Sequence, residues 1–428
     1  MDLKNVPQTC YGDSATIEVP TKKDAKMQAA SVTFHSSHVQ RDFSNGLLAI
    51  EVARRFPHTS SVVRKQVTYS VPVGFHVHND CVAAALLTLV GRMCPLVTFN
   101  FPISERCALI LRETYDLLDI GPVDPHMEPR QPGRHLAINF SGGTDSTGLY
   151  LLLEAALGDD FKVITCDFGP TFRLERAGYL HVRRDVTCAT DLRIQALDRA
   201  GRFISSVAML HADYLDLHSV ASGHTLLHEI STLSSLVDGD PPDYRSRDAV
   251  YHGAGLEEAH IVRGLQTPGI FRIIIERAPH WVEGAFAASA RPVTEKYYSR
   301  AVWVRQVYRD LGLPLPDFLK NLPAPTIRWP HNPGQRFSMF TLWALKYEGV
   351  DAVRPLMPHI NPSDFAFLND MSLLYMEKYN TNVTPLIPSA IRPRVLSALQ
   401  KHGIGPYNER DWQELAITRR EMFSSPTP

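Results

Sequence analysis

The sequence has few of the features that mark secreted, zinc-binding or membrane proteins. It holds six cysteines in 428 residues, none in a CxxC pair, so neither a zinc ribbon nor a disulfide framework is supported. It has no run of about 18 apolar residues, and its first residues, MDLKNVPQTCYGDS, lack the basic and apolar regions of a secretory leader. These absences predict a cytoplasmic protein with reduced thiols and no membrane span.

Charge of one sign is also lacking. Lys and Arg number 44 against 45 Asp and Glu, a net charge of −1, so no basic excess points to nucleic acid. The length suits two or three domains. The patterns predict an N-terminal α+β domain over 1–130, a central domain over 135–315 and a mostly helical region over 316–428. Residues 121–134, rich in Pro and Gly, are expected to be a linker.

The central region is expected to have an α/β fold with a doubly wound, mostly parallel sheet. Strand patterns at HLAINF, FKVITCDFG and HSVASG alternate with helical patterns, which is typical of βαβ units. A further strand is expected at FRIIIERA and a helix at TEKYYSRAVWVRQVYRDLG, with a polar loop over the site at 238–270. In such folds ligands bind at the carboxyl ends of the strands.

The segment SGGTDS, residues 141–146, lies where the first of these strands passes into a helix. Two glycines let the backbone approach a ligand closely, and the helix directs its unpaired N–H groups toward the loop. The hydroxyls of Ser141 and Ser146 add hydrogen-bond donors. Together they predict a phosphate cradle, in which Asp145 would hold Mg²⁺ or order the loop.

SGGTDS resembles the PP-loop, with pattern SGGxDS, of the ATP pyrophosphatase superfamily; the Walker A pattern GxxxxGK[ST] is absent. The resemblance implies a PP-loop (HUP-like) fold that binds ATP with Mg²⁺, cleaves it to AMP and pyrophosphate, and usually adenylates a substrate. It implies ATP contacts from the whole loop: Ser141, Gly142, Gly143, Thr144, Asp145 and Ser146.

Three later segments extend the resemblance, which covers roughly residues 135–315. TCDFGPTFRLE resembles a segment of 7-cyano-7-deazaguanine synthases and implies nucleotide contacts from Asp167, Phe168 and Gly169, with Glu175 in register toward the substrate. VASGHTLLHE resembles the GHxxDDxxE segment of thiolation and ligase members. ARPVTEKYYSRAVWVRQVYRDLGLP resembles a late segment whose Lys reaches the phosphates, here Lys296.

In the second of these segments, Gly223, His224 and Glu229 match the superfamily pattern. His224 is then a catalytic candidate and Glu229 the candidate for a second metal ligand, with His228 as the alternative. Leu227 and His228 replace the paired acids, which puts the second metal carboxylate in question.

Two departures narrow the reaction. No Cys follows Cys188, so the C-terminal zinc cysteines of the deazaguanine synthases are absent. The overall layout resembles that of ATP-dependent UDP-muramoyl-dipeptide glutamate epimerases, whose C-terminal cysteine cluster is also absent here.

On the substrate side, Arg173 and Arg176 suit a carboxylate or phosphate. His76, His78 and Asp80 would share one face if GFHVHND were a strand, and His78 is a substrate candidate; the alternative is that His78 or Asp80 caps a helix.

The leading hypothesis is adenylation of a small-molecule carboxylate or amide for C–N bond formation, with ammonia free or supplied by a partner. The alternatives are epimerisation through an acyl-adenylate, modification of a transfer-RNA base, and nucleotide sensing without turnover.

Overall fold

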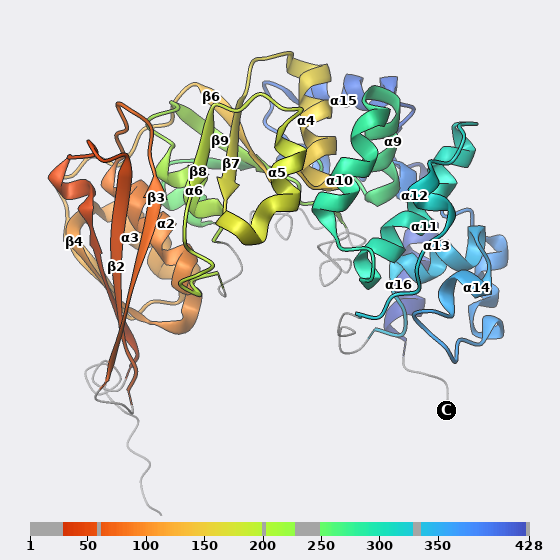
Figure 1. The fold of residues 1–428 in the computed structure, drawn as a ribbon, viewed down its shortest axis with the longest axis horizontal. Helices are drawn as coiled ribbons and strands as arrows, with labels where there is room; N and C mark the ends of the chain where they lie inside the picture. The colour runs from red at the N-terminus through yellow and green to blue at the C-terminus, as the bar shows by residue number, and fades with distance from the viewer. Residues whose placement is uncertain (1–28, 58–60, 199–202, 227–248, 328–334, 425–428) are drawn as a thin grey trace, which may run out of the picture.

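The structure, a computed structural model, describes residues 29–57, 61–198, 203–226, 249–327 and 335–424, apart from the side chains of 171–173 and 177. Figure 1 shows three parts in a row: an N-terminal sheet, a second sheet in the middle, and a helical part at the opposite end. The chain is therefore an α/β protein, as the sequence predicts.

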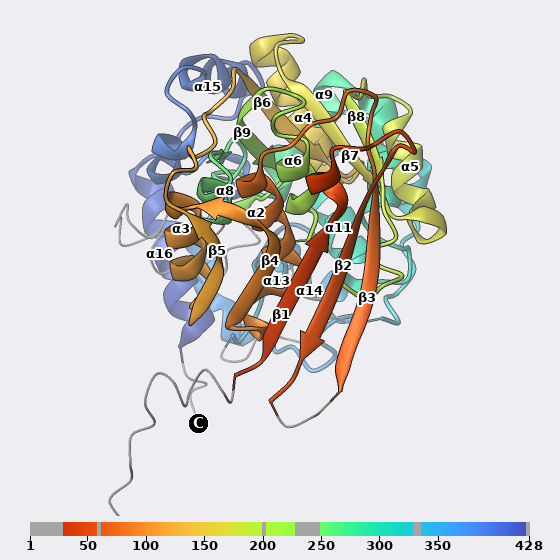
Figure 2. The same ribbon diagram turned by 90° about the vertical axis from the view of Figure 1, so that its left-hand side faces the viewer.

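The first sheet has the strand order β3-β2-β1-β4-β5. β1, β2 and β3 pair antiparallel, whereas β1, β4 and β5 run parallel. Buried and exposed side chains alternate along the strands, because helices cover one face, while Figure 2 shows the other face turned to the viewer. The strands are β1 Ser31–Ser36, β2 Leu47–Arg55, β3 Val62–Ser70, β4 Leu96–Ser104 and β5 Asp119–Asp124.

The second sheet is parallel throughout, in the order β10-β9-β6-β7-β8. The sequence order reverses between β6 and β9, so the sheet is doubly wound and Rossmann-like. Its central strands are buried almost without a break, as expected when helices cover both faces. The strands are β6 His135–Phe140, β7 Lys162–Asp167, β8 Val186–Ala189, β9 Leu217–Ser222 and β10 Glu257–Ala259. The three strands predicted at 135–140, 161–169 and 218–223 are confirmed.

Helix α2, Asn79–Val90, lies between the two sheets. It packs on β4 of the first sheet and on α6, Ser205–Leu210, which packs in turn on the second sheet. All residues of α2 except Asn79 are buried, which explains the unbroken apolar run CVAAALLTLV in its sequence. A second helix, α3 Glu105–Tyr115, also covers the first sheet.

The described residues after β10 are mostly helical. A second apolar cluster, which includes Trp303, Trp343 and Tyr375, holds the C-terminal part. None of the described helices has the length and apolarity needed to cross a membrane. The helices are α4 Thr144–Leu157, α5 Arg173–Tyr179, α8 Val250–Gly253, α9 Thr267–Arg277, α10 Val282–Ser289, α11 Glu295–Asp310, α12 Asp317–Lys320, α13 Met339–Tyr347, α14 Val350–Val353, α15 Arg392–Lys401 and α16 Glu409–Phe423.

The two sheets meet along the edges of β3 and β8. Tyr69 forms an isolated antiparallel bridge with Thr190. The Ala189 N–H donates to Ser70 Oγ at 2.7 Å, and the Thr68 N–H donates to the Asp191 carboxylate at 2.8 Å. One apolar core runs through both sheets, so the N-terminal region is packed onto the rest of the chain.

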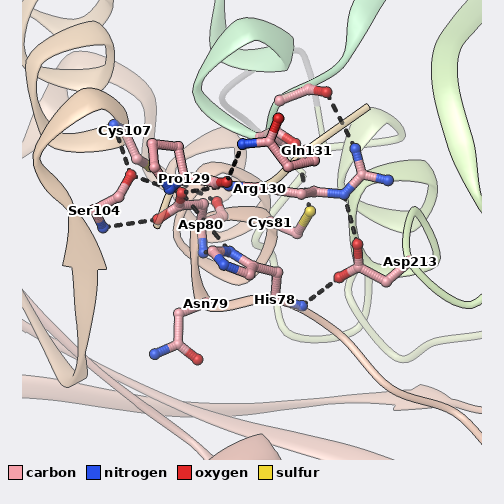
Figure 3. Close-up of polar contacts among 12 residues, drawn as sticks. His78, Asn79, Asp80, Cys81, Ser104, Cys107, Pro129, Arg130, Gln131 and Asp213 are labelled. Carbon is pink, nitrogen blue, oxygen red and sulfur yellow. Dashed lines mark hydrogen bonds and ion pairs between the residues drawn. The ribbon is translucent and has the colours of Figure 1, made fainter. Parts of the chain in front are cut away.

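The linker expected at 121–134 is partly wrong. β5 extends into it as far as Asp124, and Arg130 is buried. The Arg130 guanidinium donates to Asp213 at 2.6 Å (Figure 3). It also donates to the carbonyls of Ala212, Leu217 and Gly255. This segment is thus anchored, because one buried side chain bonds to a carboxylate and three carbonyls from other parts of the chain.

The strand expected at FRIIIERA is wrong, since these residues belong to α9. Its β-branched run favours a strand locally, but Pro268 starts a helix and Ile270, Ile273 and Ile274 form one buried face. Gly148 of α4 admits this face closely, because a Cβ there would lie 2.7 Å from Ile270 Cγ2.

Two further expectations fail. Residues 249–270, part of the predicted loop, form α8, β10 and the start of α9, and they pack in the core; residues 238–248 lie outside the described residues. His76, His78 and Asp80 do not lie on a strand. His78 is instead the N-cap of α2, accepting the Asp80 N–H at 3.2 Å, the role given to it by the alternative interpretation.

Candidate nucleotide-binding site

A pocket of about 370 Å³ opens where β6 and β9 end. This is the point at which the strand order reverses, where doubly wound sheets bind ligands. Segments far apart in sequence line it, among them the loop 141–146, residues 222–224 after β9, and α11 through Lys296 and Arg300. The structure thus brings together residues that the sequence singles out separately.

The loop is built as a turn into α4. Ser141 and Ser146 join their hydroxyls at 3.1 Å, and Ser146 Oγ donates to the Gly143 carbonyl at 3.0 Å. Gly143 is the N-cap of α4 and makes no side-chain cap. The first N–H groups of the helix therefore have no carbonyl partners inside the helix, and that of Thr144 donates to Ser289 Oγ.

Two glycines allow the close packing that shapes this loop. Gly142 has φ +77°, and a Cβ there would lie 2.7 Å from the Glu175 carbonyl of α5. At Gly223, after β9, a Cβ would lie 2.8 Å from the Ser146 N–H nitrogen. Only glycine fits these positions without movement of the backbone, so both glycines set the form of the loop.

Asp145, the predicted metal ligand, is engaged by an arginine. Arg300 donates to the Asp145 carboxylate at 2.6 Å, and both side chains are largely buried. Arg300 also donates to Ser289 Oγ at 3.2 Å, which accepts the Thr144 N–H at 2.7 Å. A polar network therefore ties α11 and α10 to the first turn of α4.

The pocket holds three cationic side chains, Arg193, Lys296 and Arg300, against the carboxylates of Asp145 and Glu175. Burial lowers the pKa of the Lys296 ammonium, Arg300 lowers it further, and Asp145 opposes both. Burial raises the pKa of the Glu175 carboxyl, and nearby arginines oppose this. The cationic excess suits an anionic ligand.

His224 lines the opposite wall of the pocket, with its Nδ1 3.8 Å from the Glu258 carboxylate of β10. The Glu258 side chain is buried and lies 3.6 Å from His260 Nε2 as well. Glu229, the second predicted metal ligand, lies outside the described residues, as do Leu227 and His228.

The predicted nucleotide contacts after β7 do not line this pocket. Arg176 holds the Asp167 carboxylate with two bonds of 2.7 and 2.8 Å, and the Gly169 N–H donates to it. Phe168 is buried against Phe203. These contacts stabilise the turn after β7, so the segment supports the pocket wall.

The substrate candidates are scattered. Glu175 lines the pocket, whereas Arg176 pairs with Asp167 and is half exposed. The side chain of Arg173 is outside the described part of the chain. His78 lines a different pocket, beside the first sheet.

Sequence reasoning missed Arg193, Ser289 and Arg300 as pocket residues. Arg300 had a usable signal, because it follows Lys296 by four residues and shares its helix face. Ser289 and Arg193 had none, because tertiary packing alone brings them to the loop.

The described carboxylates suit Mg²⁺ that arrives with a phosphate ligand. No three His, Cys, Asp or Glu side chains of the described residues cluster as a metal site. Mg²⁺ usually takes one or two protein carboxylates together with phosphates and water. Asp145, once released from Arg300, fits that role.

Comparison with known proteins adds no relative: no family model, no curated protein and no solved structure matches the chain.

Proposed function

We propose that this protein binds ATP in the pocket at the ends of β6 and β9, cleaves it to AMP and pyrophosphate, and adenylates a small-molecule carboxylate or amide. One observation carries the proposal: SGGTDS, Gly223-His224 and Lys296 surround a single pocket at the switch point of a doubly wound sheet. A PP-loop, HUP-like fold accounts for this convergence.

The pocket supplies the groups that such a transfer needs. The first N–H groups of α4 donate to phosphate oxygens, and Lys296, Arg300 and Arg193 offset the charge that develops as pyrophosphate leaves. Mg²⁺ would neutralise phosphate charge when bound. In the chemical step a carboxylate oxygen bonds to the α-phosphorus. The bond between the α-phosphorus and the oxygen that bridges it to the β-phosphorus breaks, giving an acyl adenylate and pyrophosphate.

His224 and the Asp145–Arg300 pair have separate tasks in this proposal. The amine or ammonia would attack the activated carbon of the adenylate, the C–O bond to AMP would break with AMP leaving, and His224 would take the proton from the nitrogen. Asp145 would exchange Arg300 for the Mg²⁺ carried by ATP, which releases the guanidinium to the phosphates. The amide, nitrile or other product is decided by the acceptor and by this nucleophile.

The test incubates the full chain with ATP and pools of carboxylates or amides, and measures pyrophosphate and ADP. We expect pyrophosphate, and an Asp145→Asn variant should release it at least about a hundredfold more slowly. The matched control, Asp160→Asn, changes an exposed carboxylate beyond α4 and should match wild type. ADP in place of pyrophosphate, or full activity in Asp145→Asn, would overturn the proposal.

A nucleotide sensor is the second candidate, because the Arg300 pair occupies the one carboxylate of the loop. It predicts saturable ATP binding with no pyrophosphate from any pool. In that case Asp145→Asn would change ATP affinity alone, as measured by calorimetry.

A further inference from the structure

A second pocket, of about 750 Å³, lies beside the first sheet. Its walls come from the turn after β1, the segment before α2 and the end of β4, so it opens at the carboxyl ends of the two parallel strands β1 and β4. It shares no lining residue with the nucleotide pocket. The proposed ATP chemistry does not use it.

The floor of this pocket is polar but internally satisfied. His38 is buried; its Nε2 donates to Asn79 Oδ1 at 3.0 Å and its Nδ1 accepts from Ser36 Oγ at 2.8 Å. The Asn79 amide is oriented by its bond to the Pro102 carbonyl. Burial also lowers the pKa of His38, so this ring stays neutral and contributes no charge to a ligand.

The donors that remain toward the pocket come from Arg41 and His78, because the neutral His76 ring uses its Nδ1–H on the Gly74 carbonyl at 3.1 Å. Nδ1 of His78 accepts the Asp80 N–H, so the proton of the neutral ring is on Nε2, on the opposite edge of the ring. Arg41 is exposed, and no hydrogen bond or ion pair of its guanidinium is found among the described residues. Its backbone is held at φ 53° by a bond to the His38 carbonyl, a conformation uncommon outside glycine.

A buried network holds His78 in place. Figure 3 shows Asp213 between the His78 backbone N–H, which donates to it, and the Arg130 guanidinium, which pairs with it at 2.6 Å. Asp80 accepts from the Ser104 N–H and hydroxyl at 2.9 and 2.7 Å. The carboxylate of Asp213 lines the pocket with its charge offset by Arg130, so Arg41 sets the sign of the pocket's charge.

The rest of the wall is apolar. Phe43 meets Phe75 edge to face with ring centroids 5.0 Å apart, and Phe101 packs against His38 at 4.5 Å. Val77 and Pro102 complete this side. No three His, Cys, Asp or Glu residues of the described chain gather as a metal site, and one unpaired arginine matches a single negative charge.

We infer that this pocket binds a small organic carboxylate with a flat apolar body. The carboxylate pairs with Arg41 and accepts the His78 Nε2–H, and the body lies along Phe43 and Phe75. Arginine–carboxylate pairing and aromatic contact are the recognition modes that this wall offers.

The test follows 4-fluorophenylacetate by ¹⁹F NMR as the full chain is titrated. We expect saturable binding with a dissociation constant of about 1 mM or below, and much weaker binding of the neutral 4-fluorophenylacetamide. Arg41→Asn and His78→Asn should each weaken the carboxylate about tenfold or more. Asparagine tolerates the left-handed backbone at position 41 and keeps the helix cap at position 78.

Two controls isolate the pocket. Arg106→Gln removes an exposed arginine of α3 and should bind as wild type, and Asp145→Asn, in the nucleotide pocket, should do the same. The inference is overturned if the carboxylate shows no saturation, if the amide binds equally well, or if both pocket variants retain wild-type affinity.

Discussion

At the scale of single residues, Lys296 and Arg300 lie one turn apart on α11 and line the same pocket, but their surroundings differ. Arg300 is paired with Asp145, whereas Lys296 is half-buried beside that pair. Burial and the arginine both make the Lys296 ammonium easier to deprotonate. We therefore expect the proposed activity to be lost at alkaline pH, when Lys296 loses its proton.

Pyrophosphate release should fall with rising pH at a value below 10.5, the ordinary pKa of lysine, because the required cation is present below the lowered pKa of Lys296 and lost above it. Lys296→Gln should reduce release by about 10²–10³-fold. Lys296→Arg should keep activity and move the alkaline limit upward, since arginine stays protonated.

The measurement is the pH profile of pyrophosphate release. Lys401→Gln, at an exposed position of α15, is the matched control and should follow the wild-type profile. Superimposable profiles for wild type and Lys296→Arg would contradict this role of Lys296.

The site residues that the sequence predicts best are those whose contacts lie within one short segment of the chain. Ser141, Gly143 and Ser146 act within one strand–helix turn, and each lines the pocket. Asp167 fails as a pocket residue because Arg176, nine positions later, folds back onto it. Such a contact depends on the path of α5, which no local pattern specifies.

At the scale of elements, the end of β9 and the start of α4 approach so closely that only glycine fits between them. Gly223→Ala should cost about 1–3 kcal/mol of unfolding free energy, since its Cβ would lie 2.8–2.9 Å from backbone atoms of Ser146 and Asp145. ATP binding should weaken as well, because the loop must shift.

Gly284→Ala is the matched control. A Cβ at Gly284, inside α10, meets nothing within 4 Å, so alanine should stabilise that helix by up to about 1 kcal/mol. Urea unfolding and calorimetry of ATP binding measure both variants. Equal unfolding free energies for the two variants would show that β9 and α4 can move apart to admit a Cβ without loss of stability.

At the scale of elements it is also clear why β6 is predicted correctly from the sequence and α9 is not. HLAINF is short, apolar and followed by a glycine-rich turn, so its strand is determined locally. FRIIIERA carries an equally β-branched run, but it packs on α4 through residues spaced three and four apart. Short apolar runs do not distinguish the two until their packing partners are known.

At the scale of the whole molecule, Arg130 links the chain after the first sheet to both ends of the α6–β9 connection. Arg130→Met should cost about 3–5 kcal/mol, because it leaves the Asp213 carboxylate without its cationic partner and the Gly255 carbonyl without this donor. The carbonyls of Ala212 and Leu217 lose one bond each but keep a backbone N–H donor. Replacing Asp213 with Asn in the same chain should recover part of the loss.

Arg134→Met tests whether burial is the cause. Arg134 lies four residues after Arg130 and also forms an ion pair, with Asp216. The side chains of this second pair are 83% and 41% exposed. Losing that pair should cost at most about 1 kcal/mol in urea unfolding. A comparable loss in both variants would contradict the anchoring role of Arg130.

The sequence predicts the doubly wound sheet, but it does not predict that the first sheet packs against it. The segment 121–134 has the composition of a linker, and the buried state of Arg130 depends on carbonyls from residues 212, 217 and 255. The pocket beside the first sheet likewise needs that arrangement, since Asp213 joins its wall from the second sheet's connection.

The meeting of β3 and β8 bears on self-association. Two five-stranded sheets have four edges, and each edge is a template for pairing with another chain. Here the end of β3, residues 68–70, is turned toward β8 and the segment after it, while the start of β3, residues 62–64, is exposed. β5 carries Pro122, which offers no N–H, and β10 is three residues long. Of the described edges, the exposed start of β3 is therefore the one most open to pairing with another chain.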